Sequence, residues 1–196
     1  MTLAGGNLSR AKNFHLTLTA IGLPEKNIPV IKRSGAAPGD LIYNAGTLGE
    51  AAAWLTLNDR QKKSGAYSGF RKSFWLPEPG LREGSLLARG RLATSMTDSS
   101  DGLLRSVEIL SGESGCSAEI EPEERIASPL LKKFCGMNRE KWLGYAVIGG
   151  EDYSLVFTIR PENEKRLLKI IPKAVRVGIM RNGLAGRILG YVPKKD

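Results

Sequence analysis

The chain has 196 residues, of which 41% are apolar, 25% charged and 7% aromatic. This composition is typical of a globular protein and excludes fibrous, collagenous and wholly disordered classes. The length corresponds to one large domain or to one and a half small ones. No apolar run approaches the roughly 20 residues that a membrane helix needs, and the N-terminus lacks the apolar core of a secretory signal. We therefore expect a cytoplasmic protein.

The formal net charge is +9, from 29 basic and 20 acidic residues. A charge of this size suits anionic partners, either nucleic acid or phosphorylated small molecules. The basic residues are interspersed with acidic ones, and no arginine-rich stripe alternates with aromatic residues. We therefore favour a solvated, mildly basic surface, and we expect neither a nucleic-acid nor a membrane partner.

Two cysteines and one histidine limit the available chemistry. Cys116 and Cys135 are too few for a disulfide framework and lack the spacing of metal ligands, so both are expected to be reduced and structural. His15 lies in a segment that alternates apolar and polar residues. We interpret it as a hydrogen-bonded strand residue and not as a catalytic group.

Hydrophobic periodicity and the positions of glycine and proline predict mixed secondary structure. Strands are predicted at residues 14–22, 41–44, 118–120, 154–159, 174–179 and 187–192. Helices are predicted at residues 47–57, 101–110, 129–134 and 161–171. Residues 61–90, which contain several glycines and prolines, are predicted to form a short helical turn around 61–66 and then an extended stretch. Helices and strands mix throughout, which predicts an α/β or α+β domain whose helices cover a sheet.

The first motif is Thr97-Asp98-Ser99-Ser100-Asp101-Gly102, directly before a predicted helix. Serine and aspartate at such a position can cap a helix and interact favourably with its dipole. Alternatively, Asp98 and Asp101 point into one cleft and hold a hard cation such as Mg²⁺ through oxygen. The motif alone favours the capping interpretation.

The second motif is Gly149-Gly150-Glu151-Asp152-Tyr153, which runs into a strongly apolar predicted strand. The carboxylates are either surface charges on a hairpin or contacts to a ligand. Glycines at this position would let a ligand approach the backbone closely, and a carboxylate could then contact a cationic or hydroxylated group.

The third motif runs from Lys32 to Asp40, with a basic pair before a glycine-rich turn. Arg33 could bind phosphate oxygens in a forked geometry, and exposed amides of the turn could bind anions. On its own, the segment is better explained as a solvated turn. The chain contains neither a Walker-type phosphate loop nor a G-x-G-x-x-G element after a strand, which argues against those nucleotide sites.

Taken in order, the motifs GGNLSRA, RSGAAPGD, GTLGEAAA, DSSDGLL, SGCSAEI, GGEDYSLVFTI and VGIM resemble the thiamine-monophosphate kinase family over nearly the whole chain. That family belongs to the superfamily of aminoimidazole ribonucleotide synthetase, selenophosphate synthetase and hydrogenase-maturation factor. D-x-S-D-G and G-G-E-D-Y are the most specific elements, and they indicate the kinase and not its cousins. The resemblance implies a three-layer α/β/α C-terminal domain.

The same resemblance implies ATP-dependent phosphorylation of thiamine monophosphate to thiamine diphosphate. The acceptor is already ionised, so the chemical difficulty is to bring two polyanions together. Several Mg²⁺ ions held by carboxylates would reduce that repulsion and align the reacting oxygens. Such chemistry requires aspartate and glycine and makes no demand on histidine or cysteine.

The resemblance also implies roles for particular residues. Asp98 and Asp101 look like magnesium ligands, and Gly6 and Asn7 resemble the family's nucleotide and metal element. The implied ATP contacts are Gly6, Asn7, Arg33 and Ser100. For the substrate, Glu151 looks like the carboxylate that contacts thiamine phosphate, and Tyr191 is similar to an aromatic residue that packs against the thiamine rings. No separate catalytic residue is implied.

The sequence also departs from the family pattern. Residue 7 is asparagine where many members have aspartate, Gly80 follows LPEP where P-x-P-R is frequent, and Trp54 stands where a small residue is common. The family's N-terminal domain, with its G-D-D-A-A motif, has no counterpart in this chain. We therefore expect residues 1–22 to be a leftover strand of that domain and residues 23–196 to be the C-terminal domain.

Half of an active site cannot gather all the metals, so we expect the chain to be inactive without the missing half. Its expected partners are ATP, thiamine monophosphate, and either a second copy in a homodimer or the missing N-terminal domain. The alternative is a non-catalytic module that binds a nucleotide, a phosphate ligand or a partner. Another member of the superfamily is a weaker alternative, because it would leave the Glu151-Asp152-Tyr153 cluster unexplained.

Overall fold

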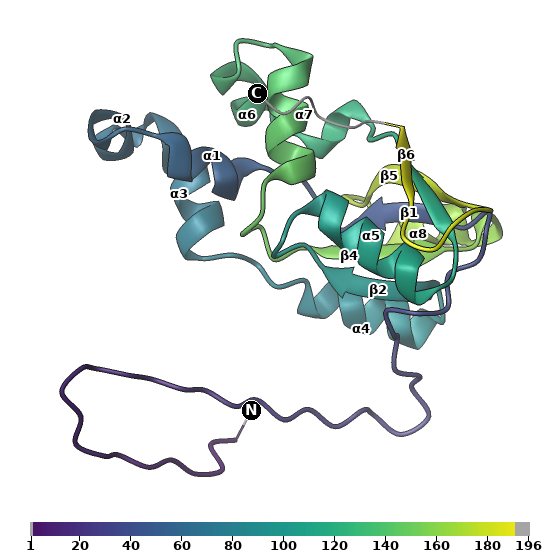
Figure 1. The fold of residues 1–196 in the computed structure, drawn as a ribbon, viewed down its shortest axis with the longest axis horizontal. Coiled ribbons are helices and arrows are strands. Elements are labelled where there is room, and N and C mark those ends of the chain that lie inside the picture. Colours follow the sequence, from purple (N-terminus) through teal and green to yellow (C-terminus); the bar gives the residue numbers. More distant parts are fainter. Residues whose placement is uncertain (1, 191–196) are drawn as a thin grey trace.

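A six-stranded sheet forms the centre of the computed structural model, which describes residues 2–190 (Figure 1). The strand order is β2-β4-β1-β5-β3-β6. Neighbouring strands are antiparallel, except that β3 and β6 are parallel. The strands are β1 (Leu41–Asn44), β2 (Ala93–Asp98), β3 (Ser117–Ile120), β4 (Leu155–Ile159), β5 (Val175–Arg181) and β6 (Ile188–Gly190).

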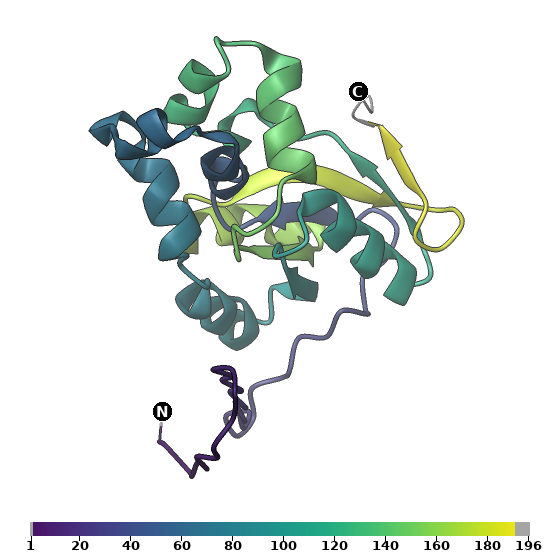
Figure 2. The same ribbon diagram turned by 60° about the vertical axis from the view of Figure 1, so that its left-hand side comes forward.

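Helices surround this sheet, as Figures 1 and 2 show. They are α1 (Glu50–Thr56), α2 (Asp59–Lys63), α3 (Ser68–Trp75), α4 (Leu81–Gly90), α5 (Leu103–Glu113), α6 (Pro129–Phe134), α7 (Arg139–Ile148) and α8 (Glu164–Ile170). Short 3₁₀ turns lie at Gly65–Tyr67, Glu124–Ile126 and Pro161–Asn163.

Two hydrophobic cores lie on opposite faces of the sheet. In β1, Ile42 packs into the core that contains residues of α1, α3, α5, α6 and α7, whereas Leu41 and Tyr43 pack into the core that contains residues of α4 and α8. This division follows from the two-residue period of a strand, which sends successive side chains to opposite faces. The arrangement confirms the expected α/β architecture with a sheet between two helical layers.

Most predicted elements are present, and several were missed. The predictions were wrong for residues 61–90, where α3 and α4 occupy most of a segment that we expected to be irregular or extended. Strand β2 and helix α7 were not predicted at all. Strand β2 carries polar side chains on its buried face, and α7 carries apolar side chains such as Tyr145 and Ile148 beside its buried face, so neither shows the usual contrast between an apolar and a polar face.

The predicted strand at residues 14–22 is wrong, because residues 2–40 form neither helix nor strand. The side chains that alternate along this segment are exposed, with Phe14 at 93% and Leu18 at 86% exposure. A strand requires a neighbouring strand to satisfy its backbone groups, and no described residue provides one here. His15 accordingly lies exposed, with Nε2 3.0 Å from Oγ1 of Thr17. The domain boundary after Gly22 stays a prediction.

Both cysteines have the expected structural character. Cys116 and Cys135 are buried free thiols in the larger core, and burial raises the pKa of each. Across residues 2–190, no helix combines the length and apolar character that crossing a membrane requires.

Candidate functional site

The Asp98 motif links the edge strand β2 to helix α5. Asp98 is the last residue of β2, and α5 begins at Leu103 after the N-cap Gly102. No side chain caps α5, and its first turn contains no acidic residue. The interpretation of the motif as a helix start, with a serine cap and an aspartate in the first turn, is therefore wrong, which leaves the partly exposed Asp98 and the exposed Asp101 available for other contacts.

The Asp98 loop and the Gly149-Gly150-Glu151 loop lie backbone against backbone. The amide of Glu151 donates to the carbonyl oxygen of Ser100 at 2.9 Å. A Cβ atom on Gly150 would lie 2.3 Å from that carbonyl oxygen, and one on Gly102 would lie 2.7 Å from the carbonyl oxygen of Ile148. Only glycine permits such an approach. The glycines of both motifs thus allow close contact between two loops that lie about fifty residues apart in the chain.

A second set of hydrogen bonds joins the same two segments at their buried side. The amide of Ser99 donates to the carbonyl oxygen of Ser154 at 2.9 Å, and the amide of Ser154 donates to Oγ of Ser99 at 3.0 Å. Ser99 is fully buried. This reciprocal pair extends the pairing of β2 with β4 and fixes how the two loops leave the sheet.

Tyr153 lies within electrostatic range of three carboxylates. The negative charge of Glu151 raises the pKa of the Tyr153 phenol most strongly, with a hydrogen bond to the same carboxylate and smaller contributions from the charges of Asp98 and Asp101. Glu151 and Tyr153 both have left-handed backbone, with φ of 68° and 49°. Such conformations cost about 1–3 kcal/mol each for non-glycine residues and are frequent at functional sites. The two sequence motifs therefore present their acids on one surface.

Arg33 lies within electrostatic range of this surface. A hydrogen bond from Ser100 is the main cause of a lowered pKa for Asp98, and the Arg33 guanidinium lowers it further. The segment that carries Arg33 runs along β2, because the amide of Met96 donates to the carbonyl oxygen of Lys32 at 2.9 Å. The exposed arginine thus adds a cation beside the aspartates.

Asp40 anchors the glycine-rich turn that follows Arg33. It is 3% exposed, and its Oδ2 accepts bonds from the hydroxyl of Thr94 at 2.6 Å and from the amide of Ala37 at 3.0 Å. Its role is therefore structural, since its carboxylate is occupied by the turn that it holds.

Asp152 ties the Glu151 loop to the start of α1. Its carboxylate accepts the amides of Gly49 at 2.8 Å and Ala51 at 3.3 Å. Protein atoms surround the carboxylate although the residue as a whole is partly exposed, and this desolvation raises its pKa to about 6 against the two favourable amide bonds. Sequence reasoning named Asp152 within its motif but gave the ligand-binding role to Glu151 alone. The adjacent pair in fact divides into an outward Glu151 and an inward Asp152.

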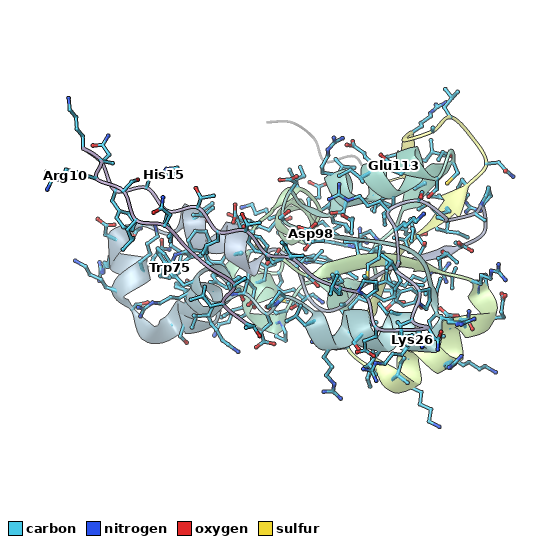
Figure 3. All side chains as sticks on the ribbon, turned by 90° about the horizontal axis from the view of Figure 1, so that it is seen from below. Arg10, His15, Lys26, Trp75, Asp98 and Glu113 are labelled. Atoms are coloured by element: carbon cyan, nitrogen blue, oxygen red, sulfur yellow. The ribbon has the colours of Figure 1, made fainter. Side chains whose placement is uncertain are left out.

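Some predicted site residues are not brought to this surface. Gly6 and Asn7 are exposed on the N-terminal segment, which runs outside the layered body in Figures 1 and 2. Figure 3 shows Arg10 and His15 of the same segment far to one side of Asp98. Tyr191 lies outside the described residues. The roles of Gly6, Asn7 and Tyr191 stay predictions.

The donor set suits Mg²⁺ only in part. Carboxylate oxygens are the ligands that this ion prefers, and proteins often hold it through one or two carboxylates together with substrate phosphates. Among residues 2–190, no group of three or more His, Cys, Asp or Glu side chains is arranged to hold a metal ion. Asp98 and Asp101 therefore fit an ion that takes its remaining ligands from phosphate, water or another polypeptide segment.

Comparison with known proteins identifies relatives of this chain. It is 37% identical over 175 residues to the thiamine-monophosphate kinase of Buchnera aphidicola (subspecies Acyrthosiphon pisum), a match that covers 87% of this chain and 52% of the relative. It is 35% identical over 193 residues to that of Methanospirillum hungatei, covering 98% of this chain and 60% of the relative. The chain is a relative of the thiamine-monophosphate kinases. No family model matches it.

Solved structures of thiamine-monophosphate kinases share its fold. The enzyme of Stenotrophomonas maltophilia superposes with a TM-score of 0.72 at 26% identity, over 82% of this chain and 52% of that one. AaThiL, solved in complex with AMPPCP and TMP, superposes with a TM-score of 0.71 at 26% identity, over 84% and 52%. The chain thus spans about half the length of most of the thiamine-monophosphate kinases that it matches.

The glycine contact between the loops can be tested with Gly150→Ala. The added methyl group must displace the Ser100 carbonyl, so we expect the free energy of unfolding to fall by about 1–3 kcal/mol. Gly144→Ala on α7 is the matched control, because a Cβ there meets nothing within 4 Å. Urea unfolding should show the control unchanged or stabilised by up to about 1 kcal/mol. Equal losses in both variants would contradict the account of the loop contact.

The raised pKa of Asp152 predicts that the free energy of unfolding depends on pH. Because folding raises its pKa from 3.8 to about 6, the folded state binds the extra proton, and stability falls as pH rises between these values. The loss amounts to at most about 3 kcal/mol. Asp152→Asn removes this component, so its free energy of unfolding relative to the wild type should rise from pH 4 to pH 7. A difference that is constant or falls over this range would refute the raised pKa.

Proposed function

We propose that the chain is the C-terminal portion of a thiamine-monophosphate kinase and supplies one side of a site that transfers the γ-phosphate of ATP to thiamine monophosphate. The observation that carries the proposal is the backbone contact that joins the Asp98 loop to the Glu151 loop, which places Asp98, Asp101 and Glu151 within electrostatic range of Tyr153. The relatives' names and the bound AMPPCP and TMP of AaThiL support it.

In the proposed reaction, a phosphate oxygen of thiamine monophosphate attacks the γ-phosphorus of ATP. The bond from that phosphorus to the bridging oxygen breaks, ADP leaves with the electron pair, and thiamine diphosphate forms. The attacking oxygen is already ionised at neutral pH, so the site needs no general base. This agrees with a surface that is built from carboxylates, hydroxyls and one arginine and contains neither histidine nor cysteine. The main barrier is repulsion between anions, which positioning and electrostatic stabilisation must overcome.

Each residue on the surface has a role that fits its position. Asp98 and Asp101 would hold Mg²⁺, which when bound neutralises phosphate charge and orients the phosphates. Arg33, close enough to lower the pKa of Asp98, would bind ATP phosphates, and Ser100 would contact ATP from the loop between the aspartates. Glu151 would bind thiamine phosphate, held outward by its left-handed backbone.

The proposal includes further roles beyond this surface. Gly6 and Asn7 would contact ATP and metal, and Tyr191 would pack on the thiamine rings. Gly6 and Asn7 are exposed on the part of the N-terminal segment that runs outside the layered body, so they need either another polypeptide segment or a second copy to reach the phosphates. The proposed chain is therefore inactive alone, works with the missing N-terminal half or as a homodimer, and resides in the cytoplasm with its substrates.

An ADP-release assay with ATP, Mg²⁺ and thiamine monophosphate tests the proposal. The chain alone should give no turnover above background. A chimaera that joins it to the unmatched part of the Methanospirillum hungatei relative should turn over. Asp101→Asn in that chimaera should lower kcat by about 10²–10³, the usual cost of losing one electrostatic contact in a transition state. Glu162→Gln, an exposed substitution on the 3₁₀ turn before α8, serves as the control.

Two results would contradict the proposal. Ordinary turnover by the chain alone would overturn its inactivity. A folded chimaera that neither turns over nor binds thiamine monophosphate in calorimetry would overturn the kinase function, and it would favour a non-catalytic module that binds phosphate ligands or a partner.

A further inference from the structure

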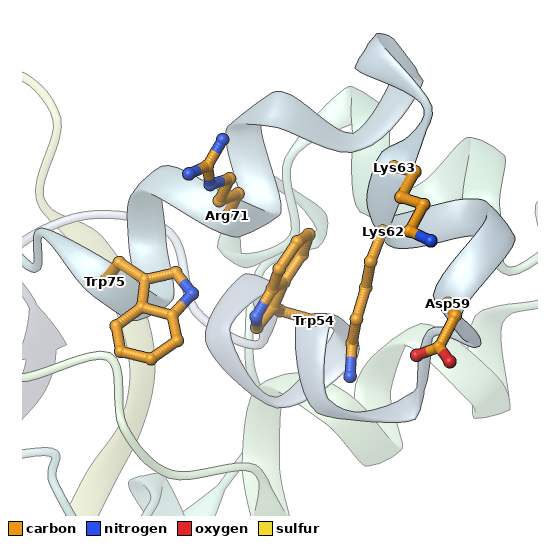
Figure 4. A pocket seen from close by; sticks show the side chains of 6 residues that line it. All are labelled: Trp54, Asp59, Lys62, Lys63, Arg71 and Trp75. Carbon is orange, nitrogen blue, oxygen red and sulfur yellow. The ribbon is translucent and has the colours of Figure 1, made fainter.

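An open cavity of about 440 Å³ lies between α1, α2 and α3, away from the acidic surface just described. Its lining side chains are Trp54, Asp59, Lys62, Lys63, Arg71 and Trp75. Figure 4 shows Trp75 and Trp54 side by side, with the Arg71 guanidinium above the space between them and the Lys62 chain on the other side of Trp54. The volume falls within the range of about 300–1,000 Å³ that is usual for small-molecule sites.

The polar groups of this cavity are nearly all donors. Two indole N–H groups, one guanidinium and two ammonium groups face a single carboxylate, that of Asp59. Within residues 2–190, none of Lys62, Lys63 and Arg71 takes part in an ion pair. A site with this excess of unpaired donors is complementary to a ligand that is rich in anionic oxygen.

The positive charge is concentrated in this part of the chain. Residues 54–75 contain five basic residues and one acidic residue, a net charge of +4 out of the chain's +9. The cations are therefore not distributed evenly over the surface. A local field of this sign favours phosphate over carboxylate ligands, since phosphate carries more charge and more acceptor oxygens.

The two tryptophans differ in a way that suits a planar ligand. Trp54 is 7% exposed, with Nζ of Lys62 5.8 Å from its ring centroid, so it forms a fixed floor. Trp75 is 64% exposed, and its ring is braced edge-on by Phe74 at a centroid distance of 5.2 Å. A tryptophan this exposed offers a large flat apolar face at low entropic cost, on which a ring can stack.

Helix α2 places its lysines here without help from hydrophobic packing. None of its residues is buried, and its start is fixed by a capping box in which Asn58 and Gln61 exchange hydrogen bonds at 3.0 Å. On its inner side, Nζ of Lys62 lies 5.8 Å from the centroid of the Trp54 ring. The short helix thus places the Lys62 ammonium group beside the indole of Trp54.

We propose that the cavity between α1, α2 and α3 binds a small phosphorylated aromatic compound, whose ring stacks on Trp75 below Arg71 and whose phosphate extends past Trp54 to Lys62 and Lys63. Trp54 forms the floor and donates from its indole edge. The site is independent of the proposed kinase function, because it shares no residue with the acidic surface.

The test is a titration of the ¹⁵N-labelled chain with AMP, followed through the indole N–H resonances of its three tryptophans. Resonances of Trp54 and Trp75 should shift saturably, whereas that of Trp142, 3% exposed in the core, should not. Lys62→Gln with Lys63→Gln should weaken binding at least about tenfold, since two charge-assisted contacts are lost. Lys165→Gln with Lys169→Gln on α8 changes the charge equally and should leave binding unchanged.

Two further ligands separate ring from phosphate. Phenyl phosphate should reproduce the AMP shifts if any phosphorylated ring is accepted, and its failure beside AMP binding would restrict the site to nucleotides. Inorganic phosphate should bind at least about tenfold more weakly than AMP, because it lacks the ring. Equal binding of inorganic phosphate, equal losses in both lysine pairs, or shifts confined to amides of residues 98–102 would overturn the proposal, as would no saturable shift at all.

Discussion

The candidate site depends on one backbone contact, in which the Ser100 carbonyl lies directly against Gly150 and accepts the amide of Glu151. A Cβ atom at position 150 would lie 2.3 Å from that carbonyl oxygen, so the two loops could not meet as they do. The neighbouring strands β2 and β4 bring the loops to the same edge of the sheet, and the Ser99 and Ser154 bonds fix their exits. Asp98, Asp101 and Glu151 lie on one surface because the backbones of their two loops are in contact.

Asp152 adds the link between this edge and the helical layer. By accepting two amides at the start of α1, it fastens the loop that carries Glu151 to the GTLGE segment. Its raised pKa shows that the arrangement costs stability near neutral pH, because a desolvated carboxylate must be held ionised. The desolvated Asp152 carboxylate and the left-handed backbone of Glu151 and Tyr153 each lower the stability of the folded state, and all three lie in one loop. Such unfavourable conformations cluster at functional sites.

The sequence predicted elements well where the signals are local. Helix α6 was predicted to the residue, and in the structure Pro129 occupies its first turn and Ser128 caps it. Strand β1 was also predicted to the residue. Strand β2 was missed because its buried side chains are hydroxyls: Oγ of Ser95 lies 2.7 Å from Oγ1 of Thr158 across the strands, which satisfies them in the interior. The apolar alternation at 14–22 failed as a predictor, since a strand also needs a partner.

For the site too, the sequence predicted local features and missed those that depend on contacts between distant segments. Motif order pointed to Asp98, Asp101 and Glu151, but the geometry was beyond the sequence, because the contact between Ser100 and Gly150 joins loops far apart in the chain. The division of labour between Glu151 and Asp152 was equally hidden, since two adjacent acids look alike until the backbone turns one outward. The cluster of cations beside Trp54 and Trp75 required three helices to come together, and one of them, α3, was not predicted.

The most direct test of the central claim is paramagnetic line broadening by Mn²⁺, which substitutes for Mg²⁺ at oxygen sites. Substoichiometric Mn²⁺ with ADP should broaden the amide resonances of residues 98–102 and 149–153 together, and Asp101→Asn should reduce the broadening in both loops. Broadening of only one loop, or of neither while another surface responds, would show that the two motifs do not form a common cation site.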